Sequence, residues 1–158
     1  MITATQAPEK YLEIFDQFNN RFASQPRWLR SLRQEAFARF SETGFPTTHD
    51  EDWRFTNVAA VASTPFELAS PDTVSREQLE PFSASQFACC LVFVNGIFSG
   101  ELSTLAPLPK GVTVGSLAAQ LKNDPASLEL HLGRYLNIQR DPFAALNTAF
   151  IEDGVYVN

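Results

Sequence analysis

Two clusters of side chains in this sequence could do chemistry. The run His49-Asp50-Glu51-Asp52 contains only metal-ligand types, and Cys89-Cys90 could ligate iron or take part in redox reactions. Consecutive side chains point in different directions, whereas ligand pairs on a helix are three or four residues apart. No second cluster completes a coordination shell. The sequence therefore favours a solvated acidic helix start over a metal site.

The two cysteines and His131 have simpler interpretations. In a strand, the sulfurs of Cys89 and Cys90 would lie on opposite faces, and no Cys-x-x-Cys motif or distant cysteine joins them. We interpret them as small buried apolar residues. His131 is expected on a helix beside Glu129 and Arg134, at a solvated surface position.

Other catalytic patterns are lacking in the sequence. The seven glycines are dispersed rather than gathered in a phosphate loop, and no serine lies in a nucleophile elbow. The sequence thus predicts a protein that is not an enzyme, with no catalytic, cofactor-binding or metal-binding residues. A small metal- or thiol-dependent enzyme that uses His49 and Cys90 is kept as an alternative.

Composition limits the remaining classes of function. The chain has 158 residues, of which 44% are hydrophobic and 19% charged, so it can form a core. Its net charge is −6 and its Lys and Arg residues are scattered, which argues against nucleic acid or an anionic membrane as partner. The N-terminus does not resemble a secretory signal, and the adjacent cysteines cannot staple distant loops. We expect a soluble, cytoplasmic protein.

The first part of the chain, residues 1–70, is expected to be helical. One helix is predicted over 8–22 and a second over 26–42, with Pro26 in its first turn and Gly44 closing it, and the two form a helical hairpin. Their apolar stripes are Tyr11, Ile14, Phe15, Phe18 and Phe22, and Leu29, Leu32, Ala36, Phe37 and Phe40.

A linker is expected over residues 71–86, which are rich in Ser, Thr and Pro. Within it, Ser75-Arg76-Glu77-Gln78 has the form of a capping box and predicts a short helix.

Residues 87–158 are expected to form a small α+β region. A strand over 87–94 turns at Asn95-Gly96, and because both its faces are apolar it should be covered on both sides. A second strand is predicted at 112–114. The chain ends on a strand, 155–158, which could pair with this hairpin; a piece of a longer protein is at least as consistent with that ending.

Three helices are predicted in the same region from their N-terminal signals. Ser116 caps a helix over 117–121, Asp124-Pro125 opens one that continues through Leu132 and Leu136, and Asp141-Pro142 opens one through Phe150.

Three stretches together resemble the SufD branch of the SufB/SufD family. They are GFPT at 44–47 with EDWRFT at 51–56; LVFVNG at 91–96 with ELS at 101–103 and LPKGV at 108–112; and FAALNTAF at 143–150 with DG at 153–154. Their order and spacing match the family from about Pro26 onward.

The resemblance implies the N-terminal region of a scaffold subunit in iron–sulfur cluster assembly. In the family this region leads into a β-helix, which pairs SufD with SufB, and a C-terminal segment binds the ATPase SufC, which holds the ATP. The family's proposed functional residues lie beyond Asn158, so none is carried over.

We therefore expect an α+β domain with a structural or recruiting role, at whose C-terminal end a β-helix starts. Trp53, Arg54 and Phe55 are candidates for a contact surface or, as the favoured interpretation, for a local core. A free-standing protein-binding module is the alternative, and self-association into a homodimer is left open.

Overall fold

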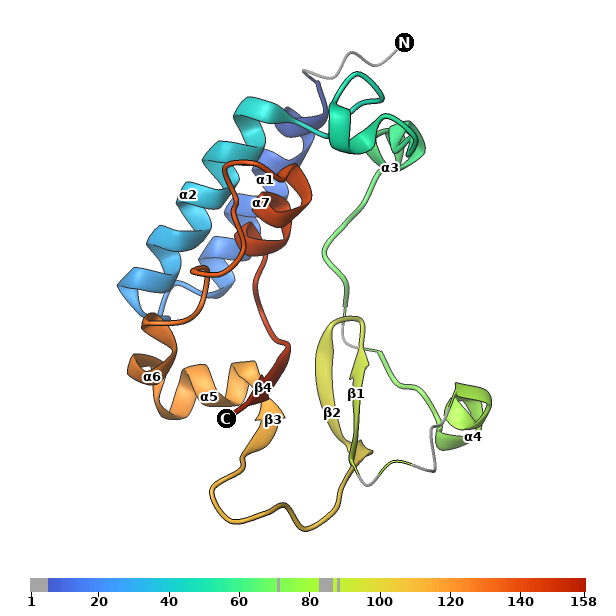
Figure 1. The fold of residues 1–158 in the computed structure, drawn as a ribbon, viewed down its shortest axis with the longest axis vertical. Helices are drawn as coiled ribbons and strands as arrows, with labels where there is room; N and C mark the ends of the chain where they lie inside the picture. Colours follow the sequence, from blue (N-terminus) through green and yellow to red (C-terminus); the bar gives the residue numbers. More distant parts are fainter. Residues whose placement is uncertain (1–5, 71, 83–86, 88) are drawn as a thin grey trace. The chain divides into compact units, whose positions relative to one another are not determined.

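The computed structural model describes residues 6–70, 72–82, 87 and 89–158. The chain divides into two compact units, the first made of residues up to Leu68 together with Glu129–Ile151, the second of Ala69–Leu128 and Glu152–Asn158 (Figure 1). Both contain helices, and antiparallel two-stranded sheets occur in the second, which is compatible with the expected α+β class. The expected boundaries at 70 and 86 stay a prediction, although segment 129–151 packs here with the first unit.

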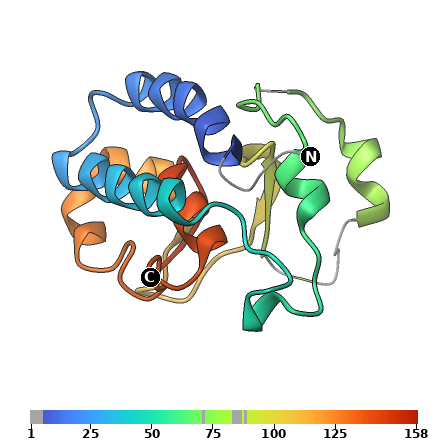
Figure 2. The same cartoon turned by 90° about the horizontal axis from the view of Figure 1, so that it is seen from above.

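The first unit is built on three helices and two shorter turns. The expected helices over 8–22 and 26–42 are present as α1 (Gln6–Arg21) and α2 (Arg27–Thr43), which lie side by side in Figure 2. Pro26 occupies the N-cap of α2 rather than its first turn, and α2 ends at Gly44, where φ is +66°. The remaining elements are η1 (Glu51–Trp53), α3 (Ala59–Ser63) and α7 (Pro142–Ala149).

Aromatic rings fill the space between α1, α2 and α7. Phe15 of α1 stacks on Phe37 of α2 with ring centroids 4.0 Å apart, and Phe150 meets both rings edge-on. Small residues of α7, Ala145 and Ala149, are completely buried against this cluster, which lets α7 approach α2 closely. Part of the high phenylalanine content, 14 residues in the whole chain, thus forms the aromatic core of this unit.

Arg33 lies inside this unit with no exposed surface. Its Nε and Nη2 atoms donate to the carbonyl oxygen of Ile151, 3.0 and 2.5 Å away. The guanidinium carbon is also 5.0 Å from the ring centre of Phe18 and 5.2 Å from that of Phe22. The side chain therefore connects α2 both to α1 and to the backbone that follows α7.

The prediction of a helix that continues through Leu132 and Leu136 is wrong beyond the first turn. The helix that opens at Asp124-Pro125 is α6 (Pro125–Glu129), and the chain then runs in turns. Gly133 has φ of +75°, and a Cβ there would lie 2.7 Å from a methyl carbon of Leu32. This left-handed, tightly packed position keeps the chain from resuming a helix after α6, and Leu136 is left 55% exposed.

In the second unit, β1 (Cys89–Val94) and β2 (Ile97–Leu105) pair antiparallel across Asn95-Gly96. Both turn residues have positive φ, +50° and +83°, as the sequence indicated. The expectation that β1 is covered on both sides is wrong for the described chain. Every residue of β1 is only partly buried, because no described element other than β2 packs extensively on it.

A bulge interrupts this pair of strands. Cys90 pairs with Thr104 but Val92 pairs with Ser99, so residues 100–103 of β2 lie opposite Leu91 alone. The Ser103 hydroxyl accepts the Val92 amide at 2.8 Å and donates to the Ser99 carbonyl at 2.6 Å. A side chain thus replaces a backbone partner at the break.

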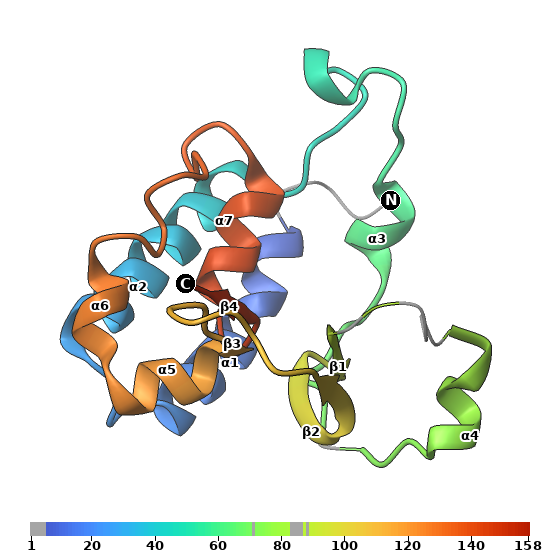
Figure 3. The same ribbon diagram turned by 60° about the horizontal axis from the view of Figure 1, so that its bottom comes forward.

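The second sheet joins β3 (Val114–Ser116) to β4 (Val155–Val157), beside α5 (Leu117–Asn123) (Figure 3). The last strand pairs with β3 rather than with the β1–β2 hairpin, and Thr113 and Asn158 exchange two further backbone hydrogen bonds. The expected strand at 112–114 is displaced by two residues. Ser116 caps α5, and the capping box at Ser75 opens α4 (Arg76–Leu79), which continues as η2 (Glu80–Phe82), as predicted.

Asp153 holds the segments of this unit together. Its Oδ1 accepts hydrogen bonds from the Ser116 hydroxyl and from the amides of Ala118 and Gly154, and its Oδ2 accepts the Phe98 amide, all at 2.8–2.9 Å. Burial raises the pKa of this carboxyl, but the four hydrogen bonds outweigh burial and hold the pKa below its usual value.

None of the helices among the described residues is long and apolar enough to cross a lipid bilayer.

Replacing Arg33 should lower the stability of the first unit more than replacing any exposed arginine does. We expect Arg33→Ala to lower the free energy of unfolding by about 3 kcal/mol, because it leaves a cavity and an unpaired Ile151 carbonyl. Arg33→Met, which keeps the volume without the donors, should fall in between. Urea denaturation followed by circular dichroism measures both, with Arg30→Ala on the exposed face of α2 as the control, expected within about 0.5 kcal/mol of the unaltered protein. A loss for Arg33→Ala no larger than this control would contradict the role assigned to Arg33.

The hydrogen bonds to Asp153 should make stability depend on pH in the acid range. Because its folded pKa lies below the usual 3.8, its contribution is complete above 3.8 and is lost as pH falls through the folded value. Asp153→Asn cannot titrate, so the stability difference between the two proteins should shrink from about pH 5 to about pH 3. Denaturant titrations at several pH values measure this, and a constant difference would contradict it.

Candidate functional site

The acidic segment 49–52 caps a turn in the structure. Asp50 Oδ2 accepts the Thr47 amide at 2.7 Å and the Thr47 hydroxyl at 3.1 Å. These bonds lower the pKa of Asp50, with a smaller contribution from the charge of His49. Among the residues that the structure describes, no three His, Cys, Asp or Glu side chains gather closely enough to hold a metal ion. The segment serves as the start of η1, as the acidic-helix interpretation proposed.

Cys89 and Cys90 are free thiols on adjacent positions of β1. They are partly exposed rather than buried, because β1 lacks the cover expected for it. Cys90 opens onto an apolar groove described below. Its proposed catalytic companion, His49, belongs to the other unit.

His131 lies in a turn after α6 and not on a helix, since the chain has left helical geometry before Gly133. Its Nδ1 is 2.6 Å from the Tyr135 hydroxyl, and the two rings face each other with centroids 6.1 Å apart. Tyr135 is 81% exposed, so the pair forms part of the solvated surface, as expected for His131.

The two interpretations of the Trp-Arg-Phe stretch each hold for part of it. Trp53 packs on Phe143 with ring centroids 5.1 Å apart and is an anchor for the turn. Phe55 is 94% exposed, and the Arg54 guanidinium lies 5.6 Å from its ring centre. Trp53 is therefore local core, whereas Arg54 and Phe55 form an exposed aromatic–cation pair of the kind that is enriched at protein interfaces.

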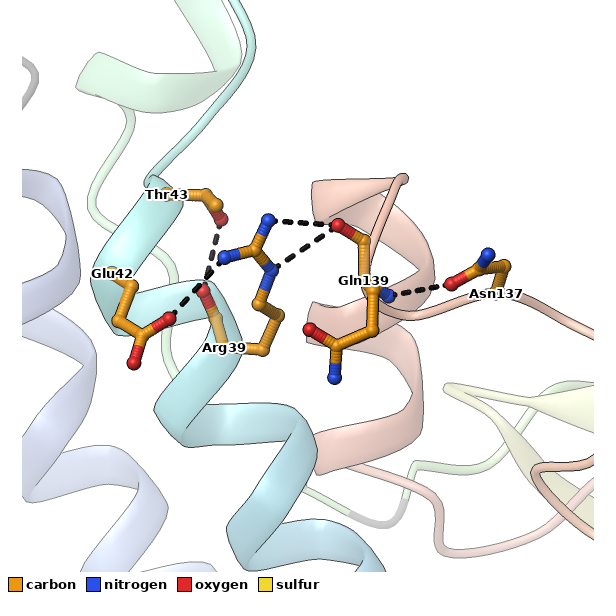
Figure 4. A network of polar contacts seen from close by, with 5 residues as sticks. All are labelled: Arg39, Glu42, Thr43, Asn137 and Gln139. Atoms are coloured by element: carbon orange, nitrogen blue, oxygen red, sulfur yellow. Dashed lines mark hydrogen bonds and ion pairs between the residues drawn. The ribbon is translucent and has the colours of Figure 1, made fainter.

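The first unit has a groove of about 590 Å³ between α2 and residues 129–139. Arg39 of α2 fixes one end of it by donating twice to the Gln139 carbonyl, at 2.8 and 3.2 Å, while also pairing with Glu42 (Figure 4). Its lining mixes aromatic and charged side chains, including Trp28, Glu35, Glu129, Arg134 and Tyr135. No described nucleophile and base pair within it, so its chemistry is that of a binding surface.

The second unit has an apolar groove of about 600 Å³ beside the β1–β2 hairpin. Phe82 and Phe87, which line it, are 84% and 62% exposed, and the Arg76 guanidinium donates to the Glu101 carbonyl at its edge. Such a surface suits the apolar side chains of a partner. Its other lining residues include Leu79, Cys90, Leu91 and Phe93.

Sequence reasoning missed two residues that organise the fold. Arg33 lies four residues from both Leu29 and Phe37, so helical periodicity alone places it on the buried face of α2. Asp153 was interpreted only as part of a turn. Nothing in the sequence indicated that its carboxylate would gather hydrogen bonds from segments 35 to 55 positions away.

Comparison with known proteins gives one family. The chain matches the model described as the SufBD protein N-terminal region over residues 5–158. It is also similar to an iron–sulfur cluster assembly SufBD family protein of Synechocystis sp., with 30% identity over 132 residues. That alignment covers 82% of this chain and 28% of the relative, so the chain spans less than a third of the relative's length. No solved structure matches the chain.

The family resemblance drawn from the three sequence stretches is thereby confirmed, without distinguishing SufB from SufD. In this chain, Trp53 of the first stretch contacts Phe143 of the third. The chain belongs to the SufBD family and corresponds to its N-terminal region.

Proposed function

We propose that this chain is the N-terminal domain of a SufD-type scaffold subunit that acts in iron–sulfur cluster assembly together with SufB and SufC. The observation that carries the proposal is the family match over residues 5–158. The relative from Synechocystis is named for iron–sulfur cluster assembly, which gives the process. The E-x-W motif at 51–53 and the hairpin with LVFVNG at 91–96, which resemble SufD more than SufB, support the choice of subunit.

The contribution of this region is structural and recruiting, without a catalytic step. Its two grooves and the exposed Arg54–Phe55 pair are binding surfaces in character. Clusters would be handled by the complex, ATP would be held by SufC, and the region would need no cofactor of its own. The chain would lead from β4 into a β-helix, and the whole would work in the cytoplasm.

A free-standing protein-binding module is the second candidate, and one observation favours it. The final strand, β4, is already paired with β3, as such a module requires. The two candidates differ in what accompanies residues 1–158. If these residues alone bind a partner as tightly as the longer protein does, the module is preferred.

The proposed partners can be tested by co-purification of the full-length protein with SufB and SufC. We expect Phe55→Ala to weaken the association by about five- to thirtyfold, since truncating an exposed aromatic anchor costs about 1–2 kcal/mol at an interface. Phe66→Ala, at another partly exposed phenylalanine of the same unit, is the matched control and should leave binding unchanged.

Two results would contradict different parts of this proposal. If the unaltered protein fails to associate with either SufB or SufC, the proposed function is wrong. If Phe55→Ala and Phe66→Ala bind alike, the complex stands but the Arg54–Phe55 pair is not its contact.

The thiol-dependent alternative predicts a cluster on the cysteines. After anaerobic incubation with iron and sulfide, we expect the protein and its Cys89→Ala and Cys90→Ala variants to show the same visible absorbance, because no further described ligand lies with the thiols. Absorbance that is present in the unaltered protein and lost in either variant would favour that alternative.

A further inference from the structure

The β1–β2 hairpin is attached to the rest of the second unit by few contacts. The Asn95 amide donates to the Ser70 carbonyl and the Arg76 guanidinium to the Glu101 carbonyl, both on exposed surfaces. The hydrogen bond from the Phe98 amide to Asp153 is instead partly buried. In the described chain, this last bond ties the hairpin to the segment that carries β4.

Packing does not compensate for the small number of bonds. Among the described residues of the second unit, the buried apolar side chains are Leu117, Leu121 and Leu128, on α5 and α6. Residues of β1 are all partly exposed, and several of β2 are exposed. A two-stranded hairpin without a covering layer is marginally stable by itself. The hairpin should therefore open at a lower free energy than the β3–β4 sheet.

The two oxygens of Asp153 have separate tasks. Oδ1 accepts Ser116, Ala118 and Gly154, and so closes the corner at which β3, α5 and β4 meet. Oδ2 accepts the Phe98 amide alone, at 2.9 Å. Loss of the Oδ2 bond would leave the described hairpin held by the two exposed hydrogen bonds of Asn95 and Arg76, without breaking any bond at the corner.

We propose that the β1–β2 hairpin is a latched arm that detaches and redocks as a unit, with the bond from the Phe98 amide to Asp153 Oδ2 as the latch. The Asn95-Gly96 turn and the strand pairing lie within the arm and move with it. A two-stranded hairpin detached from its unit is only marginally stable, so its own amides exchange faster while the arm is free. The role of this arm rests on the proposed function: in a scaffold subunit, it offers a partner a segment to capture while the corner stays folded.

The substitution Asp153→Asn separates the two tasks. Asparagine keeps one oxygen for the three donors at the corner, and its amide group then faces the Phe98 N–H, where it cannot accept. The reverse orientation would lose three bonds to keep one. We expect hydrogen–deuterium exchange of the full-length protein to be about tenfold faster over 97–105 and within about threefold of the unaltered protein over 114–121.

Ser116→Ala is the matched control, because it removes a donor to Oδ1 and the cap of α5 but leaves Oδ2 untouched. It should reverse the pattern, with faster exchange over 114–121 and little change over 97–105. If Asp153→Asn accelerates both segments equally, or neither, the latch is refuted.

Should Asp153→Asn fail to fold, the unaltered protein gives the same answer. Exchange of the Phe98 amide should be insensitive to low concentrations of urea, as in a local opening, whereas exchange of the Ala118 amide should rise with urea. If both rise together, they open only by global unfolding and the proposal is wrong. This measurement does not depend on SufB or SufC. A failure of the proposed function and a failure of the latch can therefore be told apart.

Discussion

The first unit depends on a buried guanidinium. Arg33 can be completely buried because aromatic faces and a carbonyl oxygen replace the water that its guanidinium loses. Those replacements come from Phe18 of α1, from Phe22 just after it and from Ile151, two residues after α7. Satisfying one side chain of α2 therefore fixes where three helices meet. The aromatic core around it supplies apolar area, but ring contacts alone would tolerate several arrangements. The planar guanidinium of Arg33, which donates to one carbonyl oxygen, does not tolerate several arrangements.

The sequence predicted well wherever a local signal was sufficient. The capping boxes and Asp-Pro pairs placed the starts of α4, α5, α6 and α7, and the Asn-Gly pair placed the turn of the hairpin. It failed where the decisive contact was distant. Leu132 and Leu136 keep a helical spacing, yet Gly133 must pass against Leu32, about a hundred positions earlier, and the helix stops. Similarly, the apolar strand β1 has the composition of a covered strand without the cover.

The candidate surfaces were less accessible to sequence reasoning than the fold. Trp53 and Phe55 are two residues apart and equally apolar, but one is an anchor and the other is exposed, and only the position of Phe143 decides between them. Asp153 shows the same limit for a polar residue, because its role depends on amides brought to it by the folded chain. Two of the stretches recognised as family features contact each other through Trp53 and Phe143.

The bulge in β2 has a consequence for the chain in solution. A hairpin with two open edges and apolar faces is a template on which other chains can add strands and aggregate. Between Cys90 and Val92 the ladder is broken, and residues 100–103 of β2 lie opposite Leu91 alone. Along β2, an incoming strand therefore meets no long regular row of donors and acceptors. The irregularity makes this edge of the hairpin a poor template for edge-to-edge aggregation.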